Sequence, residues 1–141
     1  MALIETAKEI GALLPTMKTV AFLGIKTADG NPPAYYVPQY AQRAGITIVP
    51  VPVFFPDVTE ILGEKVYRRL SDIPGPIDAV VVFRRPKDIP AHVDDILAAK
   101  PRIVWMQLGI RNDEVAAQLV AKGIDVVQDK CLKVELEDRG L

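Results

Sequence analysis

The chain has 141 residues, half of them hydrophobic, which suits one globular domain over residues 1–141 that buries its core without metals or disulfides. The formal net charge is -1 and no long run of one sign occurs, which argues against nucleic acid or anionic lipid as partners. The apolar runs are far shorter than the ~20 residues of a membrane-spanning helix, the N-terminus lacks a basic signal start, and the single cysteine cannot form an internal disulfide, so we expect a cytoplasmic protein with no membrane association.

The first third of the chain alternates helical and extended patterns. Apolar residues recur at helical spacing over residues 3–14, and a β-branched strand is predicted at 19–23. A second helix is predicted to begin between residues 34 and 36 and to end at residue 44. Pro38 should lie in its first turn, where a missing N–H costs nothing. A second strand is predicted at 46–51.

The remaining elements continue this alternation after an irregular stretch that we predict to be a long connection. They are the connection over residues 52–76, a strand at 78–83, a helix at 86–99, a strand at 102–107, a helix at 112–122 and a strand at 124–128. Asp88 and Asn112 are expected to cap their helices.

Strands that alternate with helices and are apolar at consecutive positions are typical of a parallel sheet covered on both faces. We therefore predict a three-layer, Rossmann-like α/β fold with a five-stranded parallel sheet and the strand order 3-2-1-4-5. A ligand should bind at the carboxyl ends of the strands, beside the first strand.

The loop after the first strand is the main candidate for a phosphate site. Gly24 ends the strand, and a loop with small and polar residues leads into a helix N-terminus, whose free amides and dipole favour anions. Lys26 and Thr27 add a charge and a hydroxyl group. The alternative is that Gly24 only permits close packing. Neither the P-loop motif nor the G-x-G-x-x-G spacing is present, which argues against classical nucleoside triphosphatases and NAD enzymes.

The second strand ends without the Asp or Glu that would bind a nicotinamide cofactor's ribose. It presents Pro50 and Val51, an apolar surface that suits an adenine ring. The prolines here could also serve only as a stiff turn.

Two arginines follow the third strand. Arg84 and Arg85 come directly after Phe83, at the carboxyl edge of the predicted sheet, where a guanidinium group could bind a phosphate. The alternative is a solvated pair, or an arginine bonded to Asp57 or Asp88.

The sequence offers little for catalysis or for a metal site. His92 is the only histidine and falls in a predicted helix, where it has no catalytic partners that we can identify. One His and one Cys do not make a metal site. Cys131 follows the fifth strand beside Lys130, which could favour its thiolate; the alternative is a small buried side chain.

Several stretches together resemble the small CoA-binding domain proteins, which are similar to the N-terminal domain of the succinyl-CoA synthetase α subunit. They are G-I-K at 24–26, I-V-P-V-P at 48–52, I-L-G-E-K-V-Y at 61–67, L-S-D-I-P at 70–74, D-A-V-V-V-F-R-R-P at 78–86, W-M-Q-L-G-I-R-N at 105–112 and D-K-C-L-K-V-E at 129–135. The resemblance implies a Rossmann-like fold and coenzyme A as ligand, with the diphosphate at the loop after Gly24 and the adenosine toward the second and third strand ends.

These arguments assign one set of residues to a coenzyme A site: Gly24, Ile25, Lys26, Thr27, Tyr36, Pro50, Val51, Phe83, Arg84, Arg85, Gln107, Gly109 and Cys131. We predict a binding module, a carrier, sensor or regulator without chemistry of its own. The alternatives are the CoA-binding subunit of an acyl-CoA ligase or transferase that needs a partner, and an NAD-binding module. The stretch at 105–109 also favours a homodimer.

Overall fold

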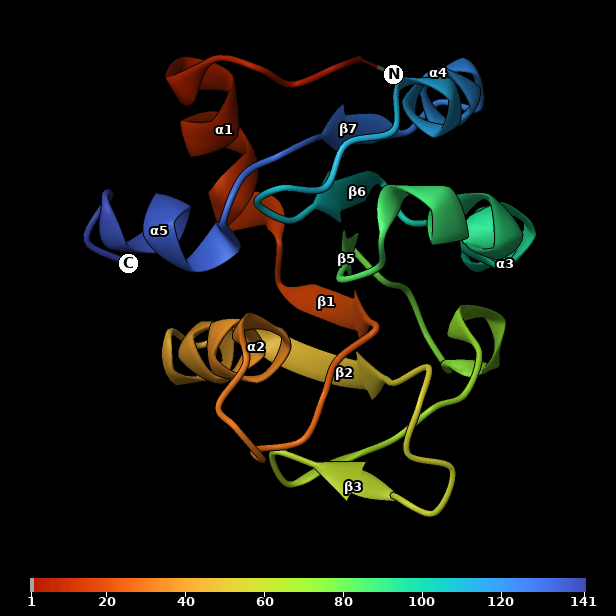
Figure 1. Cartoon of the computed structure of the whole chain (residues 1–141). Helices are drawn as coiled ribbons and strands as arrows, with labels where there is room; N and C mark the ends of the chain where they lie inside the picture. The colour runs from red at the N-terminus through yellow and green to blue at the C-terminus, as the bar shows by residue number, and fades with distance from the viewer. Residues whose placement is uncertain (1) are drawn as a thin grey trace.

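The computed structural model describes residues 2–141, and its centre is a five-stranded sheet in which every neighbouring pair is parallel (Figure 1). The strands are β1 (Thr19–Leu23), β2 (Thr47–Val51), β5 (Ala79–Val82), β6 (Ile103–Met106) and β7 (Asp125–Val127). Every strand that the sequence predicts is present, within one or two residues of its predicted ends. The predicted Rossmann-like α/β class with helices on both faces is confirmed.

The predicted strand order is wrong. The sheet runs β2-β1-β5-β6-β7, which is 2-1-3-4-5 when the five strands are counted along the chain, and not 3-2-1-4-5. The physical reason lies in β2, which carries Pro50. A proline has no N–H for a sheet ladder, so it is tolerated in an edge strand and not between two partners. The third strand therefore pairs with β1 and leaves β2 at the edge.

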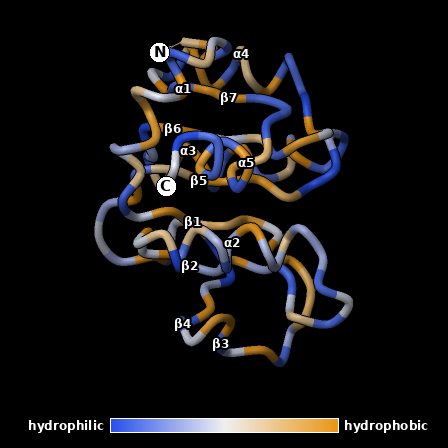
Figure 2. The backbone as a smooth tube through the Cα atoms, turned by 90° about the vertical axis from the view of Figure 1, so that its left-hand side faces the viewer, coloured by the Kyte–Doolittle hydropathy of each residue, from blue (hydrophilic) through white to orange (hydrophobic). Residues whose placement is uncertain are grey.

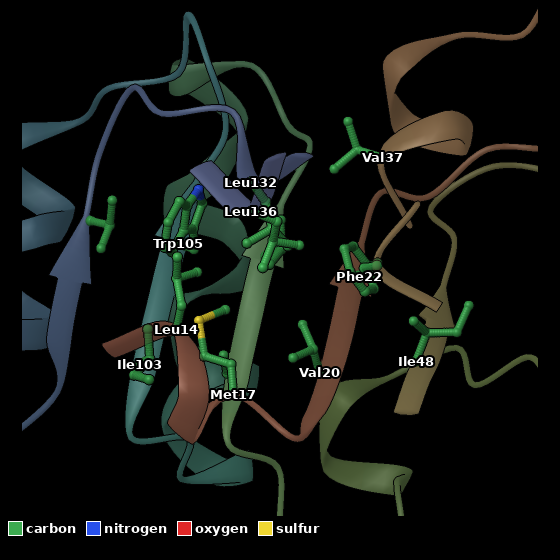
Figure 3. Packing of buried hydrophobic residues seen from close by; sticks show 14 of the residues in the cluster. Leu14, Met17, Val20, Phe22, Val37, Ile48, Ile103, Trp105, Leu132 and Leu136 are labelled. Carbon is green, nitrogen blue, oxygen red and sulfur yellow. The ribbon is translucent and has the colours of Figure 1, made fainter. Parts of the chain in front are cut away.

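Two apolar clusters lie on the two faces of the sheet. On one face α1 (Ala7–Leu13), the 3₁₀ helix η1 (Leu14–Thr16), α2 (Pro33–Arg43) and α5 (Leu132–Glu137) cover the strands. Figure 3 shows Phe22 and Trp105 of the strands in this cluster, with Val37, Leu132 and Leu136 above them. Each helix contributes the side of its surface that faces the strands.

The opposite face carries α3 (Val93–Ala99), α4 (Asp113–Ala121) and two 3₁₀ helices, η2 (Leu70–Asp72) and η3 (Pro86–His92). Ile96 of α3 and Leu119 of α4 are completely buried against the sheet. Figure 2 shows that the strands in the middle of the molecule are mainly apolar. This explains why the sequence runs for β5 and β6 lack a polar side.

The first helix begins later than predicted. Thr6 caps α1 by accepting from the Glu9 amide at 3.1 Å, and the Glu9 carboxylate accepts from the Thr6 amide at 3.0 Å. Residues before this capping box form a short parallel bridge instead, in which Leu3 pairs with Val126 of β7. The N-terminal segment therefore covers part of the edge of β7, which would otherwise expose unpaired backbone groups.

The connection between β2 and β5 contains a small hairpin, β3 (Glu60–Ile61) and β4 (Glu64–Lys65), which lies below the sheet in Figure 1. The Tyr67 amide donates to the Pro50 carbonyl at 3.0 Å, so the chain after the hairpin runs beside the edge strand. The Arg68 guanidinium donates to the carbonyls of Phe54, Phe55 and Val58 at 3.1, 2.7 and 2.7 Å. Within residues 2–141, none of the helices combines the length and the apolar character that crossing a membrane requires.

We predict that Trp105→Phe lowers the free energy of unfolding by about 1–3 kcal/mol, because the buried indole N–H donates to the Lys130 carbonyl at 2.8 Å and the variant leaves that carbonyl without its partner. Chemical denaturation measures this change. Val134→Ala, at an exposed position, is the control and should change stability by less than about 0.5 kcal/mol. Equal effects of both substitutions would contradict the prediction.

Candidate functional site

A cavity of about 320 Å³ lies where β1, β5 and β6 end. Its apolar lining comes from the two prolines that begin α2, from Phe83 and Pro86 after β5, and from Ile110 after β6. Its positive lining comes from Lys26, Arg84 and Arg85. The loops after β1 and β5 lead to helices on opposite faces of the sheet, so this cavity lies at the topological switch point, where open α/β sheets bind ligands.

Gly24 brings three strand ends together at this point. Its amide donates to the Val51 carbonyl of β2 at 2.8 Å, and its φ of 87° lies in the left-handed region. A Cβ atom at this position would overlap the Phe83 carbonyl oxygen and lie 3.0 Å from the Phe83 carbonyl carbon. The close-packing alternative for Gly24 is therefore seen directly: Gly24 does not itself line the cavity, but it packs against Phe83, which does.

The loop after Gly24 is fixed to α2 by a hydrogen bond that replaces one missing inside the helix. The prediction that Pro38 lies in the first turn of its helix is wrong, because Pro38 lies inside α2. Without an N–H it cannot donate to the Ala34 carbonyl four residues earlier. That carbonyl accepts from the Lys26 amide instead, at 3.1 Å. Ile25 is buried beside it, so the backbone of the loop is held while the exposed Lys26 side chain is free to reach a ligand.

The start of α2 offers fewer amides to an anion than the sequence analysis assumed. Pro32 is the N-cap and Pro33 the first helical residue, and neither has an N–H. The amides of Tyr35 and Tyr36 donate to the Pro32 carbonyl at 2.8 and 3.0 Å. An anion in this cavity would therefore be bound more by side-chain charge than by the backbone amides at the start of α2.

Arg84 is held by three different groups. Its Nε donates to Nε2 of His92 at 3.3 Å, its guanidinium carbon lies 5.6 Å from the centre of the Phe54 ring, and its Nη2 is 3.8 Å from the Asp88 carboxylate. Its side chain is only 17% exposed. Phe54 was not predicted to contribute, because it falls in the irregular connection and only the fold brings it over Arg84.

Arg85 is arranged differently. Its side chain is 72% exposed, and its Nε donates to the same oxygen of Asp88 at 2.9 Å. This hydrogen bond lowers the pKa of the Asp88 carboxyl group below its ordinary value, and both guanidinium charges act in the same direction. The alternative in which an arginine is bonded to Asp88 is thus realised by Arg85, and Arg84 makes a longer ion pair with the same carboxylate. Both arginines still line the cavity.

Other predicted site residues lie outside the cavity lining. Pro50 and Val51 are buried in β2, and their carbonyls accept from Tyr67 and Gly24. Tyr36 faces α5, where the Lys133 ammonium lies 5.1 Å from its ring centre. Half-buried Thr27 belongs to the loop after Gly24. None of these four positions lines the cavity.

The loops after β6 and β7 are joined to each other. Buried Gln107 accepts through Oε1 from the Leu132 amide at 3.1 Å, and the Gly109 amide, beside the cavity, donates to Asp129 at 2.6 Å. Cys131 is the N-cap of α5 and is half-buried against the apolar cluster of that face. Both alternatives for this thiol, packing and reactivity, therefore remain compatible with its position.

We predict that Gly24→Ala lowers the free energy of unfolding by about 2–4 kcal/mol, because the new Cβ adds left-handed strain to an overlap with backbone. Gly30→Ala is a matched control. Its φ is 74°, yet nothing lies within 4 Å of its Cβ position, so strain alone should cost about 1 kcal/mol. Equal losses in the two variants would mean that the close approach to Phe83 does not matter.

We also predict an acid-sensitive contribution from His92. Burial, and then the nearby Arg84 charge, lower its pKa below 6.5 in the folded protein. Below about pH 6.5, the ordinary pKa of histidine, the unfolded chain binds more protons than the folded one. The free energy of unfolding should therefore decrease as the pH is lowered from about 6.5. In His92→Gln, whose side chain does not titrate, this part of the pH slope should disappear. An unchanged slope from pH 7 to about 5.5 would contradict the assignment.

Comparisons with known proteins agree with the fold and the sequence motifs. A family model described as a CoA binding domain matches residues 18–137. Uncharacterized protein YneT of Bacillus subtilis (strain 168) is 35% identical over 126 residues, which are 89% of this chain and 90% of YneT. The structure of cell-free ID.343 from Thermus thermophilus has a TM-score of 0.86 and 37% identity and covers 95% of this chain and 98% of its own. A hypothetical protein from Pyrococcus horikoshii OT3 has a TM-score of 0.85 and 28% identity, with 95% and 92% covered. The resemblance seen in the sequence is therefore confirmed, and the chain belongs to the CoA binding domain family.

Proposed function

We propose that this chain binds coenzyme A, or an acyl-CoA, as a carrier, sensor or regulatory module without catalysis of its own. The observation that carries the proposal is the cavity at the switch point, which combines an apolar lining with three cationic side chains. Coenzyme A has phosphate groups, an adenine ring and a pantetheine arm that carries methyl and methylene groups beside its amides, and so it can use both kinds of surface. Membership of the CoA binding domain family supports the same ligand.

The positions of the charges suggest how the ligand would lie. Lys26 is exposed beside the loop after Gly24 and would bind the diphosphate as a point charge. Arg84 or Arg85 would bind the 3′-phosphate, because a guanidinium group makes charge-assisted and often bidentate bonds to phosphate oxygens. The pantetheine arm would then run past Gly109 toward the loops after β6 and β7. The 320 Å³ cavity would hold only part of such a long molecule, and the rest would lie across the surface.

Two alternatives have less support. An NAD-binding module should place a carboxylate at the end of β2, and the chain has the buried Pro50 and Val51 there. The CoA-binding subunit of an acyl-CoA ligase or transferase would need a partner that supplies the general base, because the Nε2 atom of His92 already accepts from Arg84. Turnover of acetyl-CoA or succinyl-CoA by the purified protein alone would overturn the non-catalytic part of the proposal.

We expect coenzyme A to raise the melting temperature, because a ligand that binds only the folded state stabilises it by about 2.7 kcal/mol at a hundredfold excess over Kd. NAD at the same concentration should raise it much less. Differential scanning fluorimetry measures both shifts in one experiment. Equal shifts for the two ligands, or none, would reject coenzyme A as the ligand.

We expect Lys26→Ala to weaken coenzyme A binding by roughly 1.5–3 kcal/mol, the usual size of a hydrogen bond to a charged group. Lys100→Ala is the matched control. Lys100 is also exposed, but it lies just before β6, at the amino ends of the strands and away from the cavity. Isothermal titration calorimetry gives both affinities. If folded Lys26→Ala binds as tightly as the control, Lys26 does not belong to the site.

A further inference from the structure

One carboxylate serves both arginines at the cavity. The Oδ2 atom of Asp88 lies 2.9 Å from Nε of Arg85 and 3.8 Å from Nη2 of Arg84. Both arginines line the cavity, and Asp88 contacts them from η3. The positive charge that a ligand meets is therefore partly neutralised by a group of the protein itself.

The two arginines differ in how freely they can leave this carboxylate. Arg84 is 17% exposed and is also held by His92 and by the ring of Phe54. Arg85 is 72% exposed, and exposed ion pairs are weak. A ligand phosphate can therefore recruit Arg85 at a much smaller structural cost than Arg84.

Asp88, in contrast, lies on a firmly anchored segment. The Asp88 amide donates to the Arg85 carbonyl at 2.9 Å, and the side chain of Asn112 donates to the Pro86 carbonyl at 2.9 Å. The next residue, Ile89, is completely buried. The carboxylate therefore stays near the arginines when a second anion arrives, and its negative charge repels that anion.

We propose that Asp88 is an internal competitor that occupies Arg85 in the free protein and lowers the affinity of the candidate site for phosphate groups. A phosphate monoester carries nearly two negative charges at pH 7, so it can take over a guanidinium group that a single carboxylate holds. Asp88 thereby sets how tightly the site binds. The identity of the ligand as coenzyme A rests on the proposed function, whereas the competition for Arg85 concerns any phosphate.

The test is a variant that should bind more tightly, a result that misfolding cannot produce. Asp88→Asn removes the charge and keeps the shape of the side chain, and we expect roughly 2- to 5-fold tighter binding of coenzyme A, the scale of an exposed ion pair. Asp94→Asn is the matched control, because Asp94 is exposed in the first turn of α3 and its substitution changes the net charge equally. Calorimetry at constant ionic strength measures all affinities, with dephospho-CoA as the second ligand.

A double-mutant cycle shows whether Asp88 acts through Arg85. In an Arg85→Ala background, Asp88→Asn should give a clearly smaller gain, because only the longer contact with Arg84 and the direct repulsion of the ligand remain. A gain for coenzyme A alone identifies the 3′-phosphate as the group that Arg85 binds, and an equal gain for dephospho-CoA identifies the diphosphate; both results support the competition. Unchanged or weaker binding in Asp88→Asn, or an equal gain in Asp94→Asn, would overturn it.

A titration with inorganic phosphate separates this inference from the proposed function. The NMR signal of the Arg85 Nε–H group should respond at a lower phosphate concentration in Asp88→Asn than in the natural chain. If coenzyme A does not bind but this shift occurs, the competition stands and coenzyme A is the wrong ligand. If coenzyme A binds and the phosphate response is the same in both proteins, the competition is wrong and the proposed function stands.

Discussion

The contact between Gly24 and the Phe83 carbonyl is the constraint on which the site depends. It lets the ends of β1 and β5 approach more closely than any side chain would allow, while the Gly24 amide binds the end of β2. Because the three strand ends are fixed against each other, the loops that follow them start from fixed positions. Lys26 and the two arginines are thereby gathered at one cavity, although they are about 60 residues apart in the chain.

A second constraint fixes the loop after β1. Pro38 leaves the Ala34 carbonyl without its helical donor, and the Lys26 amide takes that place. A proline inside a helix normally costs about 3 kcal/mol, partly through the lost hydrogen bond. Here the freed carbonyl is used, so part of that cost is offset and the loop gains an anchor. Together with the prolines that begin α2, this makes a wall with few free amides, so an anion bound beside it would rely on side chains.

The sequence alone predicts the strands well, because buried parallel strands are apolar at consecutive positions and this signal is local. Two errors were avoidable from local signals as well. Pro50 indicates that β2 is an edge strand, and the Thr6 to Glu9 spacing is a capping box that starts α1 after residue 6. The contact of Phe54 with Arg84, and the sharing of Asp88 by two arginines, could not be predicted, since they depend on the conformation of an irregular connection and a 3₁₀ helix.

The same charges that suit a ligand must be tolerated when no ligand is bound. Arg84 and Arg85 are neighbours in the chain at the edge of an apolar cavity, and two like charges so close together repel each other. Asp88 offsets that repulsion through both ion pairs, while Phe54 and His92 give Arg84 further partners. Each of these contacts favours the free protein, and under the proposed function each would be weakened or shared when a phosphate binds. If the proposed competition holds, the arrangement exchanges some affinity for stability, in line with the general trade-off between stability and activity. Because Arg84 has several partners and exposed Arg85 depends on Asp88, that exchange falls mainly on Arg85.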